Sequence, residues 1–508
     1  MTHEYIFALL LLIPITSGIL SQFCASQTKA LLTSFTGVFV AILLGCRVVM
    51  MALTQGRIFA FDQWLFVDEL SAWHMVVLFL VFGLSSLFAC VYLGEELREK
   101  KLSLQQAKTF AGLWSPAMAA MLLVLISNNL GIMWVGMEAT TLLTSFLVCV
   151  HITRSSLEAT WKYMLICSVG IGFAFLGTML LRLAAKDLPL DPNQALLWTN
   201  LMAHTAFLSP DLVKAAFIFA LVGYGTKAGL APMHSWLPDA HSKAPSPVSA
   251  IFSGFMLNTA LYCIMRYIPI TEETLGHRGW ALNLLTGFGL FSILMAAAFI
   301  LFQKDMKRFL AYCSVEHLGI IALGLGLGVP GTFAALFHTL NHSLSKSLAF
   351  FSAGRLGQAL GTHDIDRMSG SISISPIWGT GIFASILILI GIAPFALFMS
   401  EFQLLKAAID GHHMLVAVVF LAGTGIIFIG ALRYALPLAF GKPDGHTEPI
   451  APARLDAFLV AAPLLLLLLL GLWMPTSLQA VLNRAAGIIQ TSPAKATPTV
   501  QTDPGGRR

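Results

Sequence analysis

The sequence predicts an all-α polytopic membrane protein of about fourteen transmembrane helices. Hydrophobic residues make up 57% of the 508 positions and charged residues only 11%, whereas a soluble domain carries about a quarter charged residues. Mean hydropathy is +0.80, and apolar runs recur from end to end with no hydrophilic block between them. Because lipid-facing helices need no polar surface, we expect one membrane domain in place of the several soluble domains that length alone would suggest.

The helices follow from the apolar runs. A spanning helix needs about 20 mostly apolar residues, and this template predicts spans near 4–24, 30–52, 68–93, 114–128, 130–151, 160–183, 212–238, 245–269, 280–302, 309–328, 331–353, 376–408, 413–440 and 456–475. Only Ser127-Asn128-Asn129 separates the fourth span from the fifth. The first run is expected to be a retained helix, because Thr2-His3-Glu4 lacks the basic residues of a signal peptide.

Two spans contain helix-breaking residues. Gly225, Gly229 and Pro232 interrupt the seventh span, and Gly391 and Pro394 interrupt the twelfth, because proline removes a donor and glycine loosens the turn. A kink that merely improves packing is the alternative. Interrupted helices at corresponding positions of two halves are typical of a transporter's ion site, so we expect spans four to eight and nine to thirteen to form two repeats.

The predicted segments are therefore helices 1–3 in residues 1–113, a first repeat in 114–270, a second repeat in 271–440, a last transmembrane helix in 441–483 and a tail in 484–508. The tail is rich in Pro, Thr and Gly and is expected to be disordered.

Ionisable residues lie inside five of these spans: Glu138, Lys227, Glu316 with His317, Lys346, and Glu401. A charge at the centre of a membrane helix costs about 2.5–3.5 kcal/mol, so such a residue indicates function by default. A structural ion pair, or a side chain that reaches the interface, is the alternative for any single residue. Five helices with one such position each favour a path for protons or cations.

A proton relay needs groups whose proton affinity can be tuned by burial and by neighbours, which buried Lys, Glu and His supply. His338, His342 and Lys346 are spaced four residues apart and share one helix face, about 6 Å apart per step. His234 and His241, at the membrane edge of Pro232–Pro238, are either proton-uptake residues or ordinary loop polarity.

No metal site or cofactor is expected in this chain. His338-x-x-x-His342 lacks the Glu of H-E-x-x-H and a third ligand nearby. The seven cysteines stand singly in apolar stretches and none forms C-x-x-C, which disfavours iron–sulfur and structural zinc sites. No nickel, flavin or quinone site is evident, so any electron transfer is expected in partner subunits.

At these residues the sequence resembles the antiporter-like subunits of respiratory complex I, Mrp-type sodium/proton antiporters and membrane-bound hydrogenases. The densest match is GYGTKAGLAPMHSWLPDAHSKAPSPVSAIFSGFMLNTALY, from Gly223 to Tyr262. Other segments that carry it are NNLGIMWVGMEATTLLTSFLV, DMKRFLAYCSVEHLGIIALGLG and LNHSLSKSLAFFSAG, and VEHLG and WVGMEATT look most like the hydrogenase-4 component F group.

The resemblance implies fourteen helices, two inverted repeats with broken helices 7 and 12, and a central polar axis. Carried over by position, Glu138 pairs with Lys227, and His317 and Lys346 relay protons to Glu401. Where the family often has Lys in the eighth helix, this chain has Asn258, so the relay crosses that step by water or through His234, His241 or Glu316.

Charge bias sets the orientation. Basic residues cluster in alternate loops, and with an even number of spans both termini are expected on the non-cytoplasmic side of a bacterial inner membrane. The clusters are Arg98, Lys100, Lys101 and Lys108; Arg154 and Lys162; Lys304, Lys307 and Arg308; Arg355 and Arg367; Lys442 and Arg454.

Three functions remain open. The first is a proton-pumping, non-redox membrane subunit of a multi-subunit oxidoreductase, with membrane and peripheral redox subunits as partners. The second is a cation (Na+)/proton antiporter subunit without a redox partner. The third is a self-sufficient solute transporter. Hydrogenase or iron–sulfur genes beside this gene would support the first, small antiporter genes the second and a lone gene the third.

Overall fold

The computed structural model describes residues 3–443 and 453–490. Its first part comprises α1 (His3–Ser21), α2 (Gln27–Gln55), β1 (Ile58–Ala60), β2 (Leu65–Val67), α3 (Glu69–Arg98), α4 (Leu104–Ile126), α5 (Leu130–Val148), α6 (Arg154–Ala184), α7 (Trp198–Ala203), η1 (Thr205–Phe207), α8 (Pro210–Ala228), η2 (Met233–Trp236), α9 (Leu237–Lys243), α10 (Ser246–Ile251), the π-helical turn η3 (Phe252–Met256) and α11 (Leu257–Thr274).

The second part comprises α12 (Trp280–Ile300), α13 (Met306–Gly326), α14 (Gly328–Leu360), η4 (Asp366–Met368), α15 (Ser371–Ile374), α16 (Pro376–Leu389), α17 (Ala396–Asp410), α18 (Met414–Phe440), α19 (Arg454–Leu472) and α20 (Thr476–Ile489).

The predicted all-α membrane fold is confirmed. Twelve helical segments of the described chain are long and apolar enough to cross a membrane. The predicted spans that this set omits are α14, which has 33 residues but carries many polar ones, and the pair α16 and α17, which the break divides into 14 and 15 residues. The count of fourteen crossings and the inverted repeats stay predictions.

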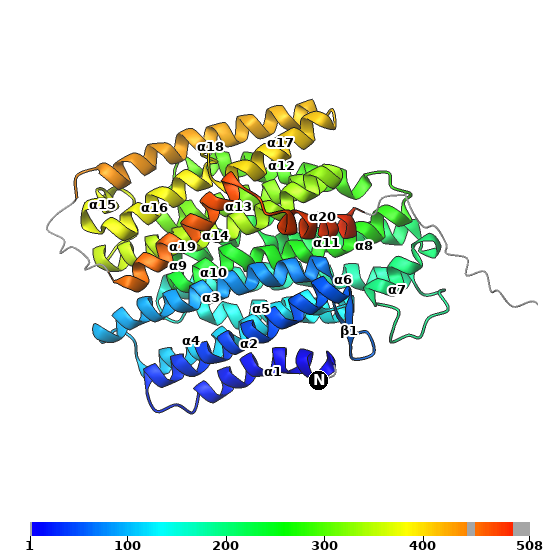
Figure 1. The fold of residues 1–508 in the computed structure, drawn as a ribbon, viewed down its shortest axis with the longest axis horizontal. Coiled ribbons are helices and arrows are strands. Elements are labelled where there is room, and N and C mark those ends of the chain that lie inside the picture. Colours follow the sequence, from blue (N-terminus) through cyan, green and yellow to red (C-terminus); the bar gives the residue numbers. More distant parts are fainter. Residues whose placement is uncertain (1–2, 444–452, 491–508) are drawn as a thin grey trace, which may run out of the picture.

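The helices lie side by side, with α1, α2 and α4 on one flank and α17 and α18 on the other (Figure 1). The buried centre consists of α10, η3 and α11, where every residue from Ser246 to Glu272 is buried, together with α13 and α14. By contrast, α2, α6 and α18 present large exposed apolar side chains such as Leu43, Leu165 and Ile429. Such a surface is suited to lipid or to other membrane subunits.

The predicted breaks are where the structure interrupts the helices. α8 ends at Ala228, and the chain passes Gly229 and Pro232 before η2 and α9 continue it. α16 ends at Leu389, and α17 begins only at Ala396, beyond Gly391 and Pro394. Each gap lies close in the sequence to a predicted relay residue, buried Lys227 in α8 or half-buried Glu401 in α17.

Several expected boundaries were wrong. α4 begins at Leu104, about ten residues before the apolar run, because Ser103 and Gln106 form a capping box that extends the helix through polar residues. The antiparallel pair β1–β2 and the short α7 were not predicted. Residues 484–489, expected in the disordered tail, belong to α20, which packs against α3, α11 and α14. Residues 491–508 lie outside the described part of the chain.

Candidate functional site: a buried polar axis

Lys227 lies in the last turn of α8 and is completely buried. Gly229, with φ of 78°, ends the helix in a Schellman motif, since the Leu230 amide donates to Gly225 O and the Gly229 amide to Thr226 O. Gly225 thus supplies the carbonyl that accepts from the Leu230 amide, and Gly229 adopts the left-handed backbone conformation. The negative end of the helix dipole favours an ammonium group at this position.

The ammonium group of Lys227 is held by hydroxyl groups. Its Nζ donates to Thr141 Oγ1 at 3.0 Å and to Tyr163 OH at 2.5 Å, and it lies 4.6 Å from the centre of the Tyr163 ring. Among the described residues it makes no ion pair within 4.0 Å. The expected Glu138–Lys227 pair is therefore not formed in this structure.

Glu138, on α5, accepts a hydrogen bond from Ser168 Oγ of α6 at 2.9 Å. Its second oxygen is buried and has no partner among the described residues. The physical reason for the missing pair is that Thr141, one turn along α5, and Tyr163 already satisfy the lysine, while Ser168 holds the carboxylate. The hydroxyl groups of Thr141, Tyr163 and Ser168 thus take the place of a direct Glu138–Lys227 contact.

Three helices meet at the second polar cluster. His317 of α13 and His338 of α14 are completely buried, and His317 Nδ1 lies 3.0 Å from His338 Nε2. His338 Nδ1 lies 2.9 Å from Ser400 Oγ of α17. The Ser400 hydroxyl donates to Leu397 O at 2.8 Å and accepts from Asn341 Nδ2.

We assign the ring protons from these contacts, taking the Ser400 hydroxyl as the donor to Leu397 O. Because the Ser400 hydroxyl already donates to Leu397 O, its oxygen accepts from His338 Nδ1–H. His338 Nε2 then carries the lone pair that accepts from His317 Nδ1–H. The lone pair of His317 Nε2 remains without a partner among the described residues. The hydrogen bond of the His317–His338 pair thus has one direction, and His317 Nε2 is free to accept a proton.

Lys346 lies two turns beyond His338 on α14 and is completely buried, with its Nζ 2.6 Å from Leu310 O. Between them, His342 is buried with both ring nitrogens unpartnered among the described residues, 5.3 Å from the His317 ring between centres. Glu316 is buried and has one unpartnered oxygen. The shared helix face predicted for His338, His342 and Lys346 is confirmed.

Glu401 is half-buried and lines a crevice of about 250 Å³ between α17 and α18. Gly391, at φ of 71°, faces it, and a Cβ at that position would overlap the carboxylate oxygen Oε2 of Glu401. The glycine in the α16–α17 break therefore provides both a left-handed turn and the space for this side chain.

Asn258, which cannot titrate, lies in α11 at the position where the family often has a lysine. It follows the π-helical turn η3, and its Nδ2 donates to Gly254 O and to Ser343 Oγ. His241, on α9, is buried with both ring nitrogens unpartnered among the described residues, and His234, in η2, is also buried and lies beside Phe299 and Tyr312. Both histidines are thus enclosed by the protein, and their place at the membrane edge stays a prediction.

The sequence analysis missed several buried charges, among them Asp68, Arg266 and Lys307. Arg266 of α11 donates two hydrogen bonds of 2.7 Å to the carboxylate of Asp68, and both side chains are buried. Lys307, assigned to a loop cluster, is buried and donates to Ala244 O. Arg266 had a signal, because it stands inside the apolar run Tyr262–Tyr267. The hydroxyl partners Tyr163, Ser168 and Ser400 had no comparable signal.

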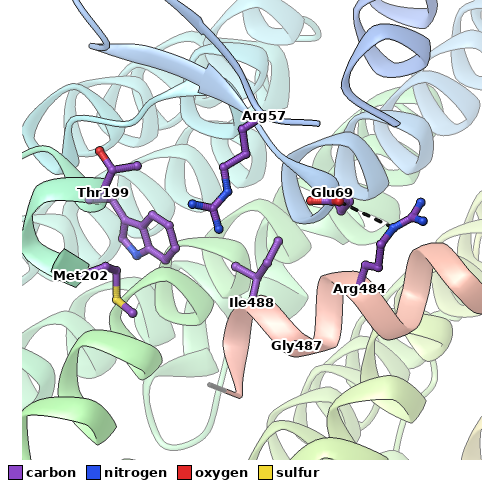
Figure 2. Close-up of a pocket in the computed structure, with 8 residues that line it drawn as sticks. Arg57, Glu69, Thr199, Met202, Arg484, Gly487 and Ile488 are labelled. Atoms are coloured by element: carbon purple, nitrogen blue, oxygen red, sulfur yellow. Dashed lines mark ion pairs between the residues drawn. The ribbon is translucent and has the colours of Figure 1, made fainter. Parts of the chain in front are cut away.

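A separate pocket of about 370 Å³ lies where α20 crosses the start of α3. Figure 2 shows Arg57 and Arg484 on its wall, with Arg484 paired to Glu69 at 3.6 Å. Two guanidinium groups against one carboxylate favour an anion. None of the predicted relay residues lines this pocket.

The sequence profile of the family described as "NADH:quinone oxidoreductase/Mrp antiporter, TM" matches residues 127–427, and the chain belongs to this family. It is 39% identical over 411 residues to the hydrogenase-4 component F homolog of Methylacidiphilum infernorum (isolate V4), covering 80% of this chain and 85% of that protein. The predicted resemblance is confirmed, and the chain is an antiporter-like membrane subunit of the hydrogenase, complex I and Mrp type.

Two solved structures share the fold. A chain of the membrane-bound sulfane sulfur reductase, an archaeal respiratory membrane complex, superimposes with a TM-score of 0.83 at 21% identity, covering 95% of this chain and 97% of that one. A chain of the Mrp complex from Dietzia sp. DQ12-45-1b gives 0.82 at 21% identity, covering 97% and 98%.

Proposed function

We propose that this chain is the proton-translocating membrane subunit of a multi-subunit oxidoreductase, hydrogenase-4-like or NADH-quinone oxidoreductase-like. Electron transfer in partner subunits drives protons through its buried Glu, Lys and His residues. The observation that carries the proposal is the hydrogen-bonded chain from Ser400 through His338 to His317, with buried Lys346 on the same face of α14. Such groups can take up and release protons inside a membrane protein.

The His317–His338 pair explains how one proton is passed on. A proton that reaches His317 Nε2 makes an imidazolium, whose Nδ1 proton moves along the 3.0 Å hydrogen bond to His338 Nε2. A carboxylate oxygen of Glu401 lies within 4.8 Å of one ring nitrogen of each histidine, and we propose Glu401 as the next proton acceptor. Lys346 supplies protons from the other side, through His342.

Lys227 and Glu138 start the axis in the first half. Because neutral hydroxyl groups hold the Lys227 ammonium, no fixed counter-charge prevents the loss of its proton. Movement of Glu138 toward or away from Lys227 then controls its proton affinity. Between the halves, Asn258 donates to the Ser343 hydroxyl, and we propose that His241 carries the proton across this step.

The test is proton uptake by vesicles that contain the assembled complex. Lys227→Ala and Glu138→Gln should each reduce uptake at least tenfold while electron transfer and subunit composition stay intact. Lys214→Ala on the same helix is the matched control, because its side chain is 42% exposed and pairs only loosely with Asp211 at 3.7 Å. Uptake by the Lys227→Ala complex equal to that of the Lys214→Ala complex would refute the relay role.

The same vesicles separate the alternatives. A cation (Na+)/proton antiporter subunit predicts Na+ movement against an imposed proton gradient without any electron donor. An oxidoreductase subunit predicts proton uptake only when the donor is supplied.

The remaining proposals concern the surroundings of the chain. We place it in the inner membrane of a bacterium, with both termini non-cytoplasmic, among other membrane subunits and peripheral iron–sulfur, hydrogenase or dehydrogenase subunits. The chain itself would carry no redox cofactor. Support for the partners comes from the family and from the large apolar surfaces of α2, α6 and α18.

A further inference from the structure

Three side chains that the sequence did not group together meet in the second half of the bundle. They are His317 of α13, His338 of α14 and Glu401 of α17, and their ligand-capable atoms all lie within 4.8 Å of one another. Only His338 belongs to the His-x-x-x-His motif, whose second histidine, His342, is not part of the group. Glu401 comes from α17, about sixty residues away in the sequence, so the spacing within α14 does not reveal it as a ligand.

The spacing of the two nitrogen atoms suits a metal ion. With Zn–N bonds of about 2.0–2.1 Å, neighbouring ligand atoms of a tetrahedral site are about 3.3 Å apart. His317 Nδ1 and His338 Nε2 are 3.0 Å apart. A small rotation of the two rings therefore replaces the shared proton by a shared metal ion.

The surroundings hold the ligands in place. Ser400 Oγ accepts from His338 Nδ1–H and is itself held by Asn341 Nδ2 and Leu397 O. This bond leaves Nε2 as the ligand atom, as outer-shell partners do in metal sites. His317 has to move its proton from Nδ1 to Nε2, and its Nε2 has no partner among the described residues that would oppose the change.

The donor set selects the class of metal. Two imidazoles and one carboxylate, with one position open, suit zinc and related divalent transition metals. Calcium and magnesium favour six or more oxygen ligands and are disfavoured. The crevice between α17 and α18 opens beside Glu401, so the carboxylate is not enclosed in the packed centre.

We propose that His317, His338 and Glu401 form a binding site for one zinc-class divalent metal ion. The ion occupies the hydrogen bond through which a proton would pass and ties α13, α14 and α17 together. Its binding depends only on the geometry above, whereas inhibition of transport by the bound ion rests on the proposed function.

Equilibrium dialysis of the purified whole complex against buffered Zn2+, with elemental mass spectrometry as the readout, tests the site. An affinity tag without histidine is required. Wild-type complex should bind one more Zn2+ per chain than His338→Gln, and Glu401→Gln should weaken this binding at least tenfold. His342→Gln is the matched control: it removes the next histidine on the same face of α14 and should retain the ion.

Equal Zn2+ content in the wild-type, His338→Gln and Glu401→Gln complexes overturns the site, as does loss of the ion in His342→Gln alone. If His338→Gln does not assemble, Ser400→Ala replaces it, since loss of an outer-shell partner weakens metal affinity by about 10–100-fold. Zn2+ that binds at this site and leaves proton uptake unchanged would uphold the site and contradict the relay. The two proposals therefore fail separately.

Discussion

Hydroxyl groups, and not an opposite charge, hold Lys227 and Glu138 in this protein. Lys227 donates to Thr141 and Tyr163, and Glu138 accepts from Ser168. A fixed ion pair in a low-dielectric interior would stabilise both charges and hold the proton on the lysine. A neutral acceptor satisfies the ammonium and lets the proton leave at a smaller cost.

Tyr163→Phe tests this arrangement. It removes one of the two acceptors of Lys227, and a hydrogen bond to a charged group contributes about 1.5–3 kcal/mol. Because about 1.4 kcal/mol corresponds to a factor of ten, proton uptake by vesicles should fall by roughly tenfold or more. Tyr224→Phe, one turn from Lys227 on α8, is the control, since the Tyr224 hydroxyl has no partner among the described residues. Equal uptake by the two variants would contradict the role of the Tyr163 hydroxyl.

His151, in the loop between α5 and α6, gives a pH dependence outside the membrane spans. The Glu96 carboxylate, 3.2 Å from the Nε2 atom of the ring, raises the pKa of His151. A pKa that is higher in the folded state than in the unfolded state stabilises the fold at pH values below the unfolded-state pKa of about 6.5. This contribution is lost as the pH rises through the folded-state pKa. The melting temperature of the complex should therefore fall by about 1 °C or less from pH 6 to pH 8.5, since a partly exposed pair contributes little.

The matched measurement is the same pH series on His151→Gln, which should lack the decrease. A wild-type curve that runs parallel to that of the variant would show that this pair contributes nothing.

At the residue scale, the sequence identifies the buried charged residues more readily than the side chains that form hydrogen bonds with them. Lys227, Lys346 and Glu401 stand out because a charge in an apolar run is costly. Ser, Thr and Tyr are ordinary in membrane helices, so nothing in the sequence marks Tyr163 or Ser400 as partners. The absent Glu138–Lys227 pair shows the same limit, because the choice of partner depends on the distance between helices.

At the scale of elements, each broken helix positions a functional side chain. Proline and glycine predicted both breaks, but the need for glycine at position 391 appears only in three dimensions, where Glu401 occupies the space of a Cβ. The metal-capable group of His317, His338 and Glu401 likewise needs three helices to meet. Local spacing within α14 could suggest only His338 and His342.

Gly391→Ala should displace Glu401. The added Cβ overlaps the carboxylate, and φ of 71° disfavours any residue with a Cβ at this position. We expect at least a tenfold loss of proton uptake with normal assembly. Gly425→Ala, on the opposite wall of the same crevice, meets nothing within 4 Å and is the control. Normal uptake by Gly391→Ala would show that the position of Glu401 is not critical.

The Asp68–Arg266 pair ties α3 to α11 inside the bundle. Breaking a buried pair by removal of one partner costs about 3–5 kcal/mol, because the other charge is left unpaired. Asp68→Asn and Arg266→Met should each lower the thermal stability of the complex strongly, and the double variant should recover most of the loss. Asn keeps the cap of α3, since Asp68 also accepts from the Ser71 amide at 2.9 Å. Additive losses in the double variant would contradict direct coupling.

At the scale of the whole molecule, the connecting segments gather at two ends. At one end the segments before α3, between α4 and α5 and before α7 bond to one another, as Leu130 N to Leu196 O and Asn128 Nδ2 to Gln63 O show. At the other end the segment before α13 pairs with the one after α14, through Asp305 and Asp364. α20 lies across the first end, where Arg484 meets Glu69.

The basic clusters belong to the second end, which includes the segment between α3 and α4 with Lys100 and Lys101 and the one before α13 with Lys304. By the positive-inside rule we expect this end on the cytoplasmic side of the membrane. A reporter that is active only outside the cytoplasm should therefore be active when fused after Ile489, and inactive when inserted at Lys100. A reporter that is inactive at both positions would place Ile489 and Lys100 on the same side, which requires an even number of crossings between them. The fourteen-span arrangement has an odd number there. Such a result would therefore mean that one of the two spans outside the twelve apolar segments, α14 or the α16–α17 pair, does not cross the membrane.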